Sequence, residues 1–189
     1  DLNFSIPKDN PIRGMANVRP EMWCYGLRNP WRMAIHPETH ELWIGDNGDE
    51  SWELVHRVFK GSNSGWSTFE GSHPFRPSNP LGGPTKVHTP PRIEHPHSEM
   101  RSVIGGVFYR GEEHPDLVDH YIYGCYMTRE IWAAHYNPET DELDKSFRIA
   151  KSSGPLVAIR EDHDRELMIT SLDGHIERLK KREDPPPLK

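Results

Sequence analysis

Short apolar runs recur along the chain, and most of them end at glycine, proline, asparagine or aspartate. Runs of roughly four to eight residues that are rich in Val, Ile, Trp and Tyr are typical of β-strands bounded by turns. No segment has the period of a long amphipathic helix, although residues 112–117 have the length of one helical turn. We therefore predict an all-β protein with strands over residues 32–36, 41–45, 53–59, 103–110, 120–125, 130–136, 155–160, 166–171 and 175–179.

An internal repeat groups these strands into units. Residues 34–44 contain an Ala-Ile pair, a polar turn and a second apolar run, and residues 158–169 repeat this order. Residues 107–132 form a looser third copy. Four-stranded units spaced by roughly 40 to 50 residues are typical of β-propeller blades. We predict about three antiparallel four-stranded blades of a partial propeller, with the rest of the ring outside this sequence because three blades cannot close one.

The composition is that of one folded domain with many loops. The chain has 189 residues, 34% of them hydrophobic, with 18 prolines, 15 glycines and a mean hydropathy of -0.81. The 10% aromatic content argues against disorder. We expect residues 1–20 to be an extended segment, residues 21–180 to be the partial propeller, and residues 181–189 to be a Pro-rich tail or linker.

Charge and hydropathy exclude two classes of partner. The net charge of -6 and the pI of about 6.1 provide no basic stripe for nucleic acid. No segment has the roughly 20 apolar residues of a transmembrane helix, and no signal-peptide pattern is present. Because the chain starts at Asp1, we expect a mature or fragmentary piece. We expect Cys24 and Cys125 to be buried free thiols, with a disulfide as the alternative.

Candidate chemistry is concentrated in three turn clusters, at residues 25–30, 45–50 and 61–66. Arg28 and Asn29 directly precede a proline, which disfavours helical geometry at Asn29 and places both side chains where a strand ends. A guanidinium binds carboxylate or phosphate through a planar fork. The turn with Asp46 and Asp49 offers hard oxygen ligands to a divalent cation. Together these clusters suggest an anionic ligand held near a metal ion.

Residues 69–101 are expected to form a long irregular connection. Loops of this length are usually functional or mobile. The His95-Pro-His97 sequence within it suggests a metal site, but no third ligand stands at a characteristic spacing. We therefore expect these histidines to be surface or rim residues.

From about residue 21 to residue 179, the chain resembles the C-terminal half of the PQQ-dependent glucose/sorbosone dehydrogenases, the soluble aldose sugar dehydrogenases. Several motifs carry the resemblance in the family's order: YGLRNP at 25–30, LWIGDNG at 42–48, GSNSGW at 61–66, YRG at 109–111, YIYG at 121–124 and DGHIERL at 173–179. The resemblance implies a six-bladed propeller that binds pyrroloquinoline quinone (PQQ) and calcium on its axial face.

The resemblance also assigns roles to residues. Arg28 and Asn29 match the pair that faces the quinone, with Arg28 as the catalytic cation, and the backbone carbonyls of Gly48 and Asp49 match those that hold the calcium. The implied activity is oxidation of a sugar or a related alcohol or aldehyde, with electrons passed to an external acceptor or a cytochrome domain. The family's histidine base belongs to an earlier blade, so we expect this chain alone to be inactive. A periplasmic or secreted location is implied as well.

Departures from the family pattern keep other functions open. Asp49 stands where proline is frequent, and Asp173 stands where some members place a lysine against the cofactor. A non-catalytic propeller that binds carbohydrate or protein is therefore an alternative, and a calcium-dependent lactonase-like hydrolase that recruits Asn29 and Asp46 is a third. For Arg28 the alternative is a salt bridge between blades. For Asp46 and Asp49 it is an ordinary hairpin turn.

Overall fold

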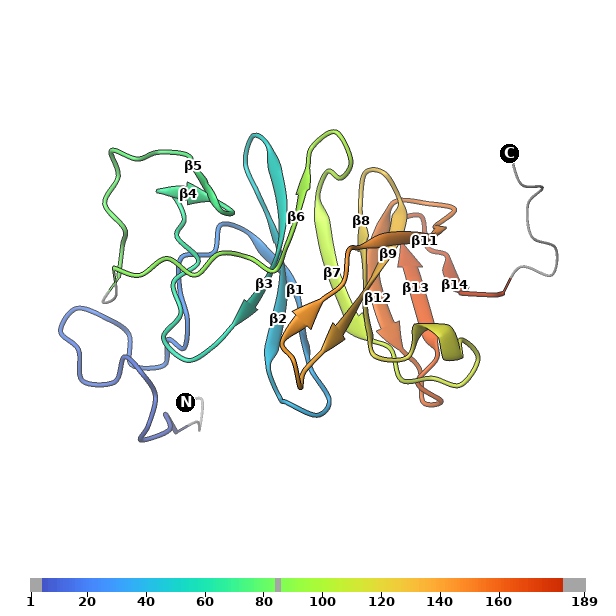
Figure 1. Cartoon of the computed structure of the whole chain (residues 1–189), viewed down its shortest axis with the longest axis horizontal. Coiled ribbons are helices and arrows are strands. Elements are labelled where there is room, and N and C mark those ends of the chain that lie inside the picture. Colours follow the sequence, from blue (N-terminus) through green and yellow to red (C-terminus); the bar gives the residue numbers. More distant parts are fainter. Residues whose placement is uncertain (1–4, 84–85, 182–189) are drawn as a thin grey trace.

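The computed structural model describes residues 5–83 and 86–181. These residues form β-strands and a single 3-10 turn, Pro115–Leu117, which lies within the predicted helical turn. Three antiparallel sheets follow one another along the chain and stand side by side (Figure 1). The prediction of about three blades of a propeller is confirmed.

Blade 1 is a four-stranded sheet in which the strand order follows the sequence. A small hairpin, β4 (Phe69–Glu70) and β5 (His73–Pro74), is inserted before its outermost strand. The outermost strand, β6 (Ile93–Pro96), lies within residues 69–101, for which the sequence predicts a long irregular connection. Its four residues lie among prolines and are too short to give a strand signal. The strands of blade 1 are β1 (Pro30–Ile35), β2 (Leu42–Asn47), β3 (Trp52–Val58) and β6 (Ile93–Pro96).

Blades 2 and 3 complete the described fold. In blade 2, two outer strands pair with different parts of the long strand β9, and in blade 3 three strands form a simple meander. The strands of blade 2 are β7 (Val103–Phe108), β8 (His120–Cys125), β9 (Glu130–Asn137), β10 (Glu142–Leu143) and β11 (Phe147–Lys151). Those of blade 3 are β12 (Leu156–Glu161), β13 (Leu167–Ser171) and β14 (Ile176–Arg178).

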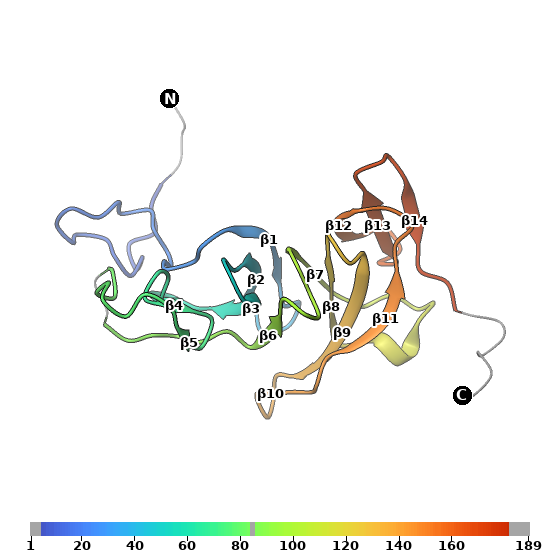
Figure 2. The ribbon, with the colours of Figure 1, turned by 90° about the horizontal axis from the view of Figure 1, so that it is seen from above.

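The blades pack through their first strands, since β7 lies between β1 and β12 and contacts both (Figure 2). Gly45 of blade 1 meets Gly105 of blade 2 so closely that a Cβ on Gly45 would lie 2.4 Å from the Gly105 nitrogen. Glycine is therefore required at this approach. The aromatic core between blades 1 and 2 includes Trp43, Tyr121 and Tyr123, all fully buried.

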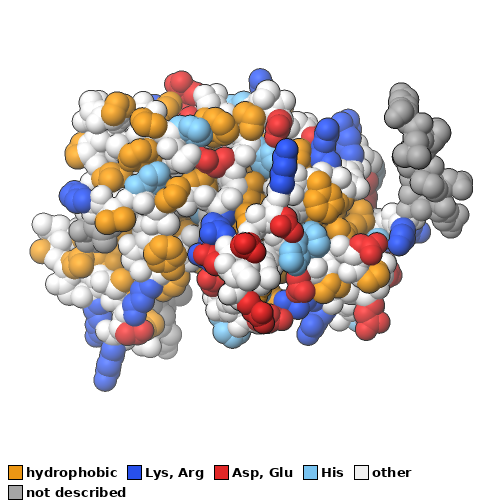
Figure 3. All heavy atoms as spheres, in the orientation of Figure 1, with side chains coloured by type: hydrophobic (Ala, Val, Ile, Leu, Met, Phe, Trp, Pro, Cys, Tyr) orange, Lys and Arg blue, Asp and Glu red, His pale blue; other side chains and the backbone are white. Residues whose placement is uncertain are grey.

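Alternate residues of β1, the first strand of blade 1, are exposed. Trp31, Met33 and Ile35 have 55%, 60% and 63% of their surface accessible, although each is a large apolar residue. On the face shown in Figure 3, acidic and basic side chains are interspersed and form no basic stripe.

The segment before blade 1 contains turns and no strand within residues 5–24, and its Ile12 is buried. Cys24 and Cys125 are both free thiols; Cys125 is buried, whereas Cys24 is half-buried. The predicted tail at 181–189 lies almost wholly outside the described residues. The division into three segments stays a prediction.

Candidate functional site

A cleft with a volume of about 570 Å³ lies where the three blades meet. Its lining includes all four residues predicted to form the site: Arg28, Asn29, Gly48 and Asp49. Blades 2 and 3 supply the opposite wall through Ile104, Val157 and Leu172. The structure therefore brings the arginine-asparagine corner and the acidic turn into one space, although their assigned roles stay predictions.

The corner is fixed from behind by Asp46. This carboxylate accepts the backbone N–H of Arg28 at 3.1 Å and that of Asn29 at 2.6 Å. A further backbone hydrogen bond, from Asn47 to the Asn29 carbonyl at 3.2 Å, ties the same corner to the end of β2. The backbone that carries the Arg28 and Asn29 side chains is therefore held in place.

Asp46 is 2% exposed and lies beside the equally buried His56, with Asp46 Oδ2 3.6 Å from His56 Nε2. Burial raises the pKa of Asp46 to about 6, although the backbone hydrogen bonds from Arg28 and Asn29 oppose this shift. Burial also lowers the pKa of His56 to about 3. His56 is therefore neutral, and Asp46 changes its charge in mildly acidic solution. Asp46 is buried and does not line the cleft, so it is not placed where the lactonase alternative needs a metal ligand.

The Arg28 guanidinium lies at the edge of the cleft between the acidic turn and an indole. It bonds the Asp49 carboxylate at 2.5 Å and the Asn47 carbonyl at 3.3 Å, and it lies 5.5 Å from the Trp66 ring centroid. Arg76 reaches the second Asp49 oxygen at 3.3 Å. The Arg28–Asp49 ion pair stays within blade 1, so it does not tie blades together. Because the Arg28 side chain is 29% exposed, an anionic ligand can reach it.

The turn after β2 requires glycine at its first position. A Cβ on Gly48 would lie 1.7 Å from the Trp52 carbonyl oxygen and 2.7 Å from Glu70 Oε1. The Trp52 carbonyl is part of the backbone, and four backbone N–H groups hold Glu70 Oε1 in place, so neither atom can move away freely. Close packing behind the cleft therefore requires glycine at position 48. The next residue, Asp49, lines the cleft.

Asn47, at the end of β2, was not predicted as a site residue. It lines the cleft and is 7% exposed, and within the described part of the chain its Oδ1 atom has no hydrogen-bond partner. A buried acceptor without a donor costs free energy unless a ligand or water satisfies it. An amide oxygen beside two backbone carbonyls is the type of ligand set that calcium prefers. The donor set at this end of the cleft therefore fits a calcium ion.

A histidine also reaches the cleft, contrary to the expectation of surface or rim positions. His97 Nε2 lies 3.1 Å from Oε1 of the buried Glu53, whose other oxygen accepts the Val103 N–H at 2.9 Å. Both His97 and Glu53 line the cleft. His95 is 5% exposed and bonds the Tyr123 hydroxyl at 2.7 Å in the core between blades. The two histidines therefore have separate environments and share no metal.

Asp173 is not brought into the cleft. Its carboxylate accepts a short hydrogen bond from the Ser171 hydroxyl and lies 3.7 Å from His175. A Cβ on Gly154 would meet the Asp173 carboxylate, which places the acid against that backbone. The neighbouring Leu172 forms part of the lining instead. Asp173 therefore does not line the space in which an anion would bind Arg28.

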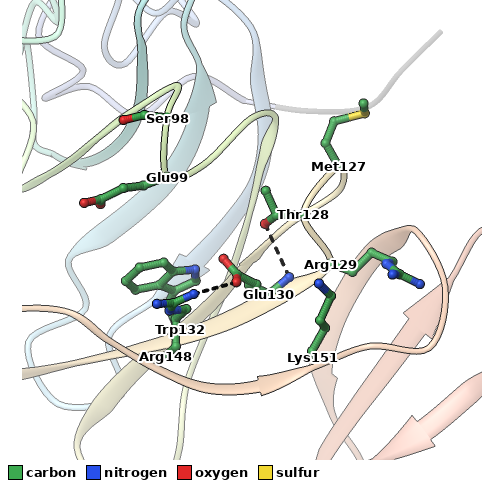
Figure 4. Close-up of a pocket in the computed structure, with 9 residues that line it drawn as sticks. All are labelled: Ser98, Glu99, Met127, Thr128, Arg129, Glu130, Trp132, Arg148 and Lys151. Carbon is green, nitrogen blue, oxygen red and sulfur yellow. Dashed lines mark hydrogen bonds and ion pairs between the residues drawn. The ribbon is translucent and has the colours of Figure 1, made fainter.

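A second cleft, of about 500 Å³, lies on blade 2 and contains none of the predicted residues (Figure 4). Arg148 bonds Glu130 at 2.8 Å and lies 5.6 Å from the centroid of the Trp132 ring. Trp132 is only 8% exposed, so its face does not offer a stacking platform to a sugar. The cleft at the junction of the blades is therefore the better candidate site.

The fold and the site together define a partial β-propeller with a cleft at the junction of its blades, lined by both polar and apolar side chains. The chain belongs to the glucose/sorbosone dehydrogenase family, whose model matches residues 2–179. It is 37% identical over 147 residues to the HIPL2 protein of Arabidopsis thaliana, covering 72% of this chain and 21% of that protein.

Solved structures agree with this assignment. The soluble aldose sugar dehydrogenase of Escherichia coli, in its apo form, superposes with a TM-score of 0.69 at 25% identity, over 87% of this chain and 47% of that one. The PQQ-bound aldose sugar dehydrogenase of Streptomyces coelicolor has the same fold, with a TM-score of 0.61 at 17% identity over 87% and 43% of the two chains. The chain thus spans about a fifth of the plant relative and less than half of these enzymes.

In the part of the chain that the structure describes, no helix has both the length and the apolar character needed to cross a membrane.

Proposed function

We propose that this chain is part of a quinoprotein dehydrogenase that oxidises a sugar or a related alcohol or aldehyde, using PQQ and calcium. Membership of the glucose/sorbosone dehydrogenase family supports the reaction class. The observation that carries the proposal is the shared cleft, in which Arg28 and Asn29 stand beside the Gly48–Asp49 turn.

The turn is the proposed calcium site. The ligands are the backbone carbonyls of Gly48 and Asp49, supported by the unpartnered Oδ1 of Asn47. All three are neutral hard oxygens of the kind that bind calcium. The nearby Asp49 carboxylate contributes negative charge while it also pairs with Arg28.

The corner is the proposed quinone site. When bound, PQQ supplies a two-electron acceptor for hydride from the substrate, and calcium supplies the polarising charge. Arg28 would contribute a positive charge near the quinone, where negative charge develops. Asp46 and Asp49 hold Arg28 in place before the reaction starts, so little energy is spent on reorienting it. Asn29 presents an amide to the cofactor's polar edge. Ile104, Val157 and Leu172 form an apolar wall that limits water in the cleft.

The remaining parts of the enzyme are proposed to lie outside this chain. We place the histidine base on an earlier blade, outside this chain. The chain by itself is then inactive. The electron acceptor is external, either a small acceptor or a cytochrome domain, and the location is periplasmic or secreted.

The proposal is tested by dye reduction with sugars as substrates, with this chain completed by preceding blades. We expect turnover that requires both PQQ and calcium. Arg28→Ala should reduce it by at least about a hundredfold, since preorganised charges at a reacting centre typically contribute this much. The matched control is Arg148→Ala, which removes the same charge from the cleft on blade 2. Absence of turnover in the unsubstituted protein, or equal turnover in the two variants, would contradict the proposal.

One observation favours a second function. The Arg28 charge is already paired with Asp49, and Trp31 lines the cleft with more than half of its surface exposed. An exposed indole beside polar groups can stack on a neutral sugar ring. Under this alternative, a non-catalytic propeller binds carbohydrate in the same cleft. A thermal shift with oligosaccharides, and none with PQQ, would distinguish it from the dehydrogenase.

A further inference from the structure

Glu70, in the inserted hairpin, lies behind the proposed calcium turn and does not line the cleft. It is 3% exposed. A single oxygen, Oε1, receives the backbone N–H groups of four successive residues, Asp49 to Trp52, at 2.6, 2.9, 3.1 and 3.2 Å. Successive N–H groups that converge in this way form an anion-binding concavity. In this protein the concavity is filled by the protein's own carboxylate.

The direction of these N–H groups determines the direction of the carbonyls. In a trans peptide, the C=O of one residue points opposite to the N–H of the next. Among the described residues, the only cis peptide joins Trp66 and Ser67. The carbonyls opposite the Asp49 and Glu50 N–H groups belong to Gly48 and Asp49, and these two N–H groups make the shortest contacts with Glu70. Both carbonyls therefore point away from Glu70.

We propose that Glu70 is a positioning residue for calcium, which orients the Gly48 and Asp49 carbonyls toward the cleft without touching the ion. The inference rests on the proposed function, because it assigns a role to the turn as a calcium site. It also explains why glycine is needed at position 48, where a Cβ would crowd both Oε1 and the Trp52 carbonyl.

The charge of Glu70 supports this role. Burial disfavours the charged form, but the backbone hydrogen bonds from Ser51, Asp49, Trp52 and Glu50 together outweigh it and hold the pKa of Glu70 below its usual value. The group is therefore a carboxylate at neutral pH. Hydrogen bonds to an ionised acceptor are stronger than neutral ones, so the turn is held firmly before any ion arrives.

A matched pair of variants tests the proposal. Glu70→Gln keeps the shape of the side chain but removes the charge. The control is Glu94→Gln: Glu94 accepts the Ser72 N–H and hydroxyl, both at 2.7 Å, and does not line the cleft. Calorimetric titration of the 189-residue chain with calcium chloride should show affinity at least about tenfold weaker for E70Q, and within about twofold of the unsubstituted chain for E94Q. Hydrogen exchange at residues 49–52 should accelerate only in E70Q.

The outcomes separate this inference from the function on which it rests. Equal calcium affinity of E70Q and the unsubstituted chain would overturn the role of Glu70 alone, even if the melting temperature fell. No calcium binding by the unsubstituted chain would overturn the proposed calcium site and this role together. If E70Q does not fold, Glu70→Asp replaces it: the charge is kept but the reach is shortened, so calcium affinity should still fall, and unchanged affinity would contradict the proposal.

Discussion

The Asp46 carboxylate accepts the Asn29 backbone N–H at 2.6 Å, although Asn29 directly precedes β1 and Asp46 lies near the end of β2. The same carboxylate bonds the Arg28 N–H. A residue that the sequence suggested as a metal ligand thus has another task, which is to hold the predicted cofactor corner in place. Several properties of the cleft follow from this relationship.

Stability should depend on pH through Asp46. Its pKa is raised from 3.8 to about 6 in the folded state, so between these values the native protein binds more protons than the unfolded chain. The unfolding free energy contributed by Asp46 therefore falls as the pH rises from 4 to 6, by about 2 kcal/mol. Asp46→Asn cannot titrate at this position. Denaturant unfolding should show the unsubstituted protein losing stability relative to D46N between pH 4 and pH 7, and a constant difference would refute the assignment.

Removal of the Asn47 side chain should weaken calcium binding without a comparable loss of folding stability. Asn47→Ala deletes an oxygen that has no donor among the described residues, together with one long hydrogen bond of 3.3 Å to the Asn29 carbonyl. We expect calcium affinity to fall by about tenfold, whereas the unfolding free energy changes by less than about 1 kcal/mol. Calcium calorimetry and urea denaturation measure the two effects. A large loss of stability with unchanged calcium affinity would assign Asn47 to the fold alone.

Gly48→Ala should be strongly destabilising, because the new methyl group would overlap the Trp52 carbonyl. Relief of the overlap requires the turn to move, at a cost of at least about 2 kcal/mol. Gly82→Ala is the control, since a Cβ there meets nothing within 4 Å and the backbone is not in the left-handed region. Thermal unfolding of both variants gives the comparison. If G48A melts like G82A, the close packing behind the cleft is not as described.

Substitution of His97 tests whether the catalytic general base lies in this chain. It is held by Glu53 at 3.1 Å and reaches the cleft, but the proposed base belongs to an earlier blade. In a protein completed by those blades, His97→Asn should lower kcat by less than about tenfold, because its role is confined to the cleft wall. General bases typically contribute a factor of 10² to 10⁴. A loss of that size in steady-state kinetics would move the base into this chain.

The strands and the location of the site could be predicted from the sequence because both depend on local signals. Short apolar runs predicted the inner strands of each blade, and the turn clusters together with the family resemblance predicted the four residues that line the cleft. Strand β6 was missed because four residues among prolines carry too little pattern.

The supporting residues were missed for a different reason. Glu70 acts on a turn that lies about twenty residues earlier in the chain, and the contact between Asn47 and the cleft depends on how the blades meet. Neither relationship leaves a local pattern. Both thiols are free as expected, but only Cys125 is buried, whereas Cys24 is half-buried. The buried His95 differs from the expectation, because the sequence gives no sign of its hydrogen bond to Tyr123 in the next blade.

The most direct test of the central claim is a thermal-shift titration of the chain with PQQ and calcium together. If the corner and the acidic turn form one cofactor site, PQQ and calcium together should give a rise in melting temperature that is several degrees larger than the rise with calcium alone. This additional rise should disappear in Arg28→Ala and persist in Arg148→Ala. An additional rise that is the same in both variants, or no additional rise at any concentration, would contradict the claim that these two turns bind a cofactor between them.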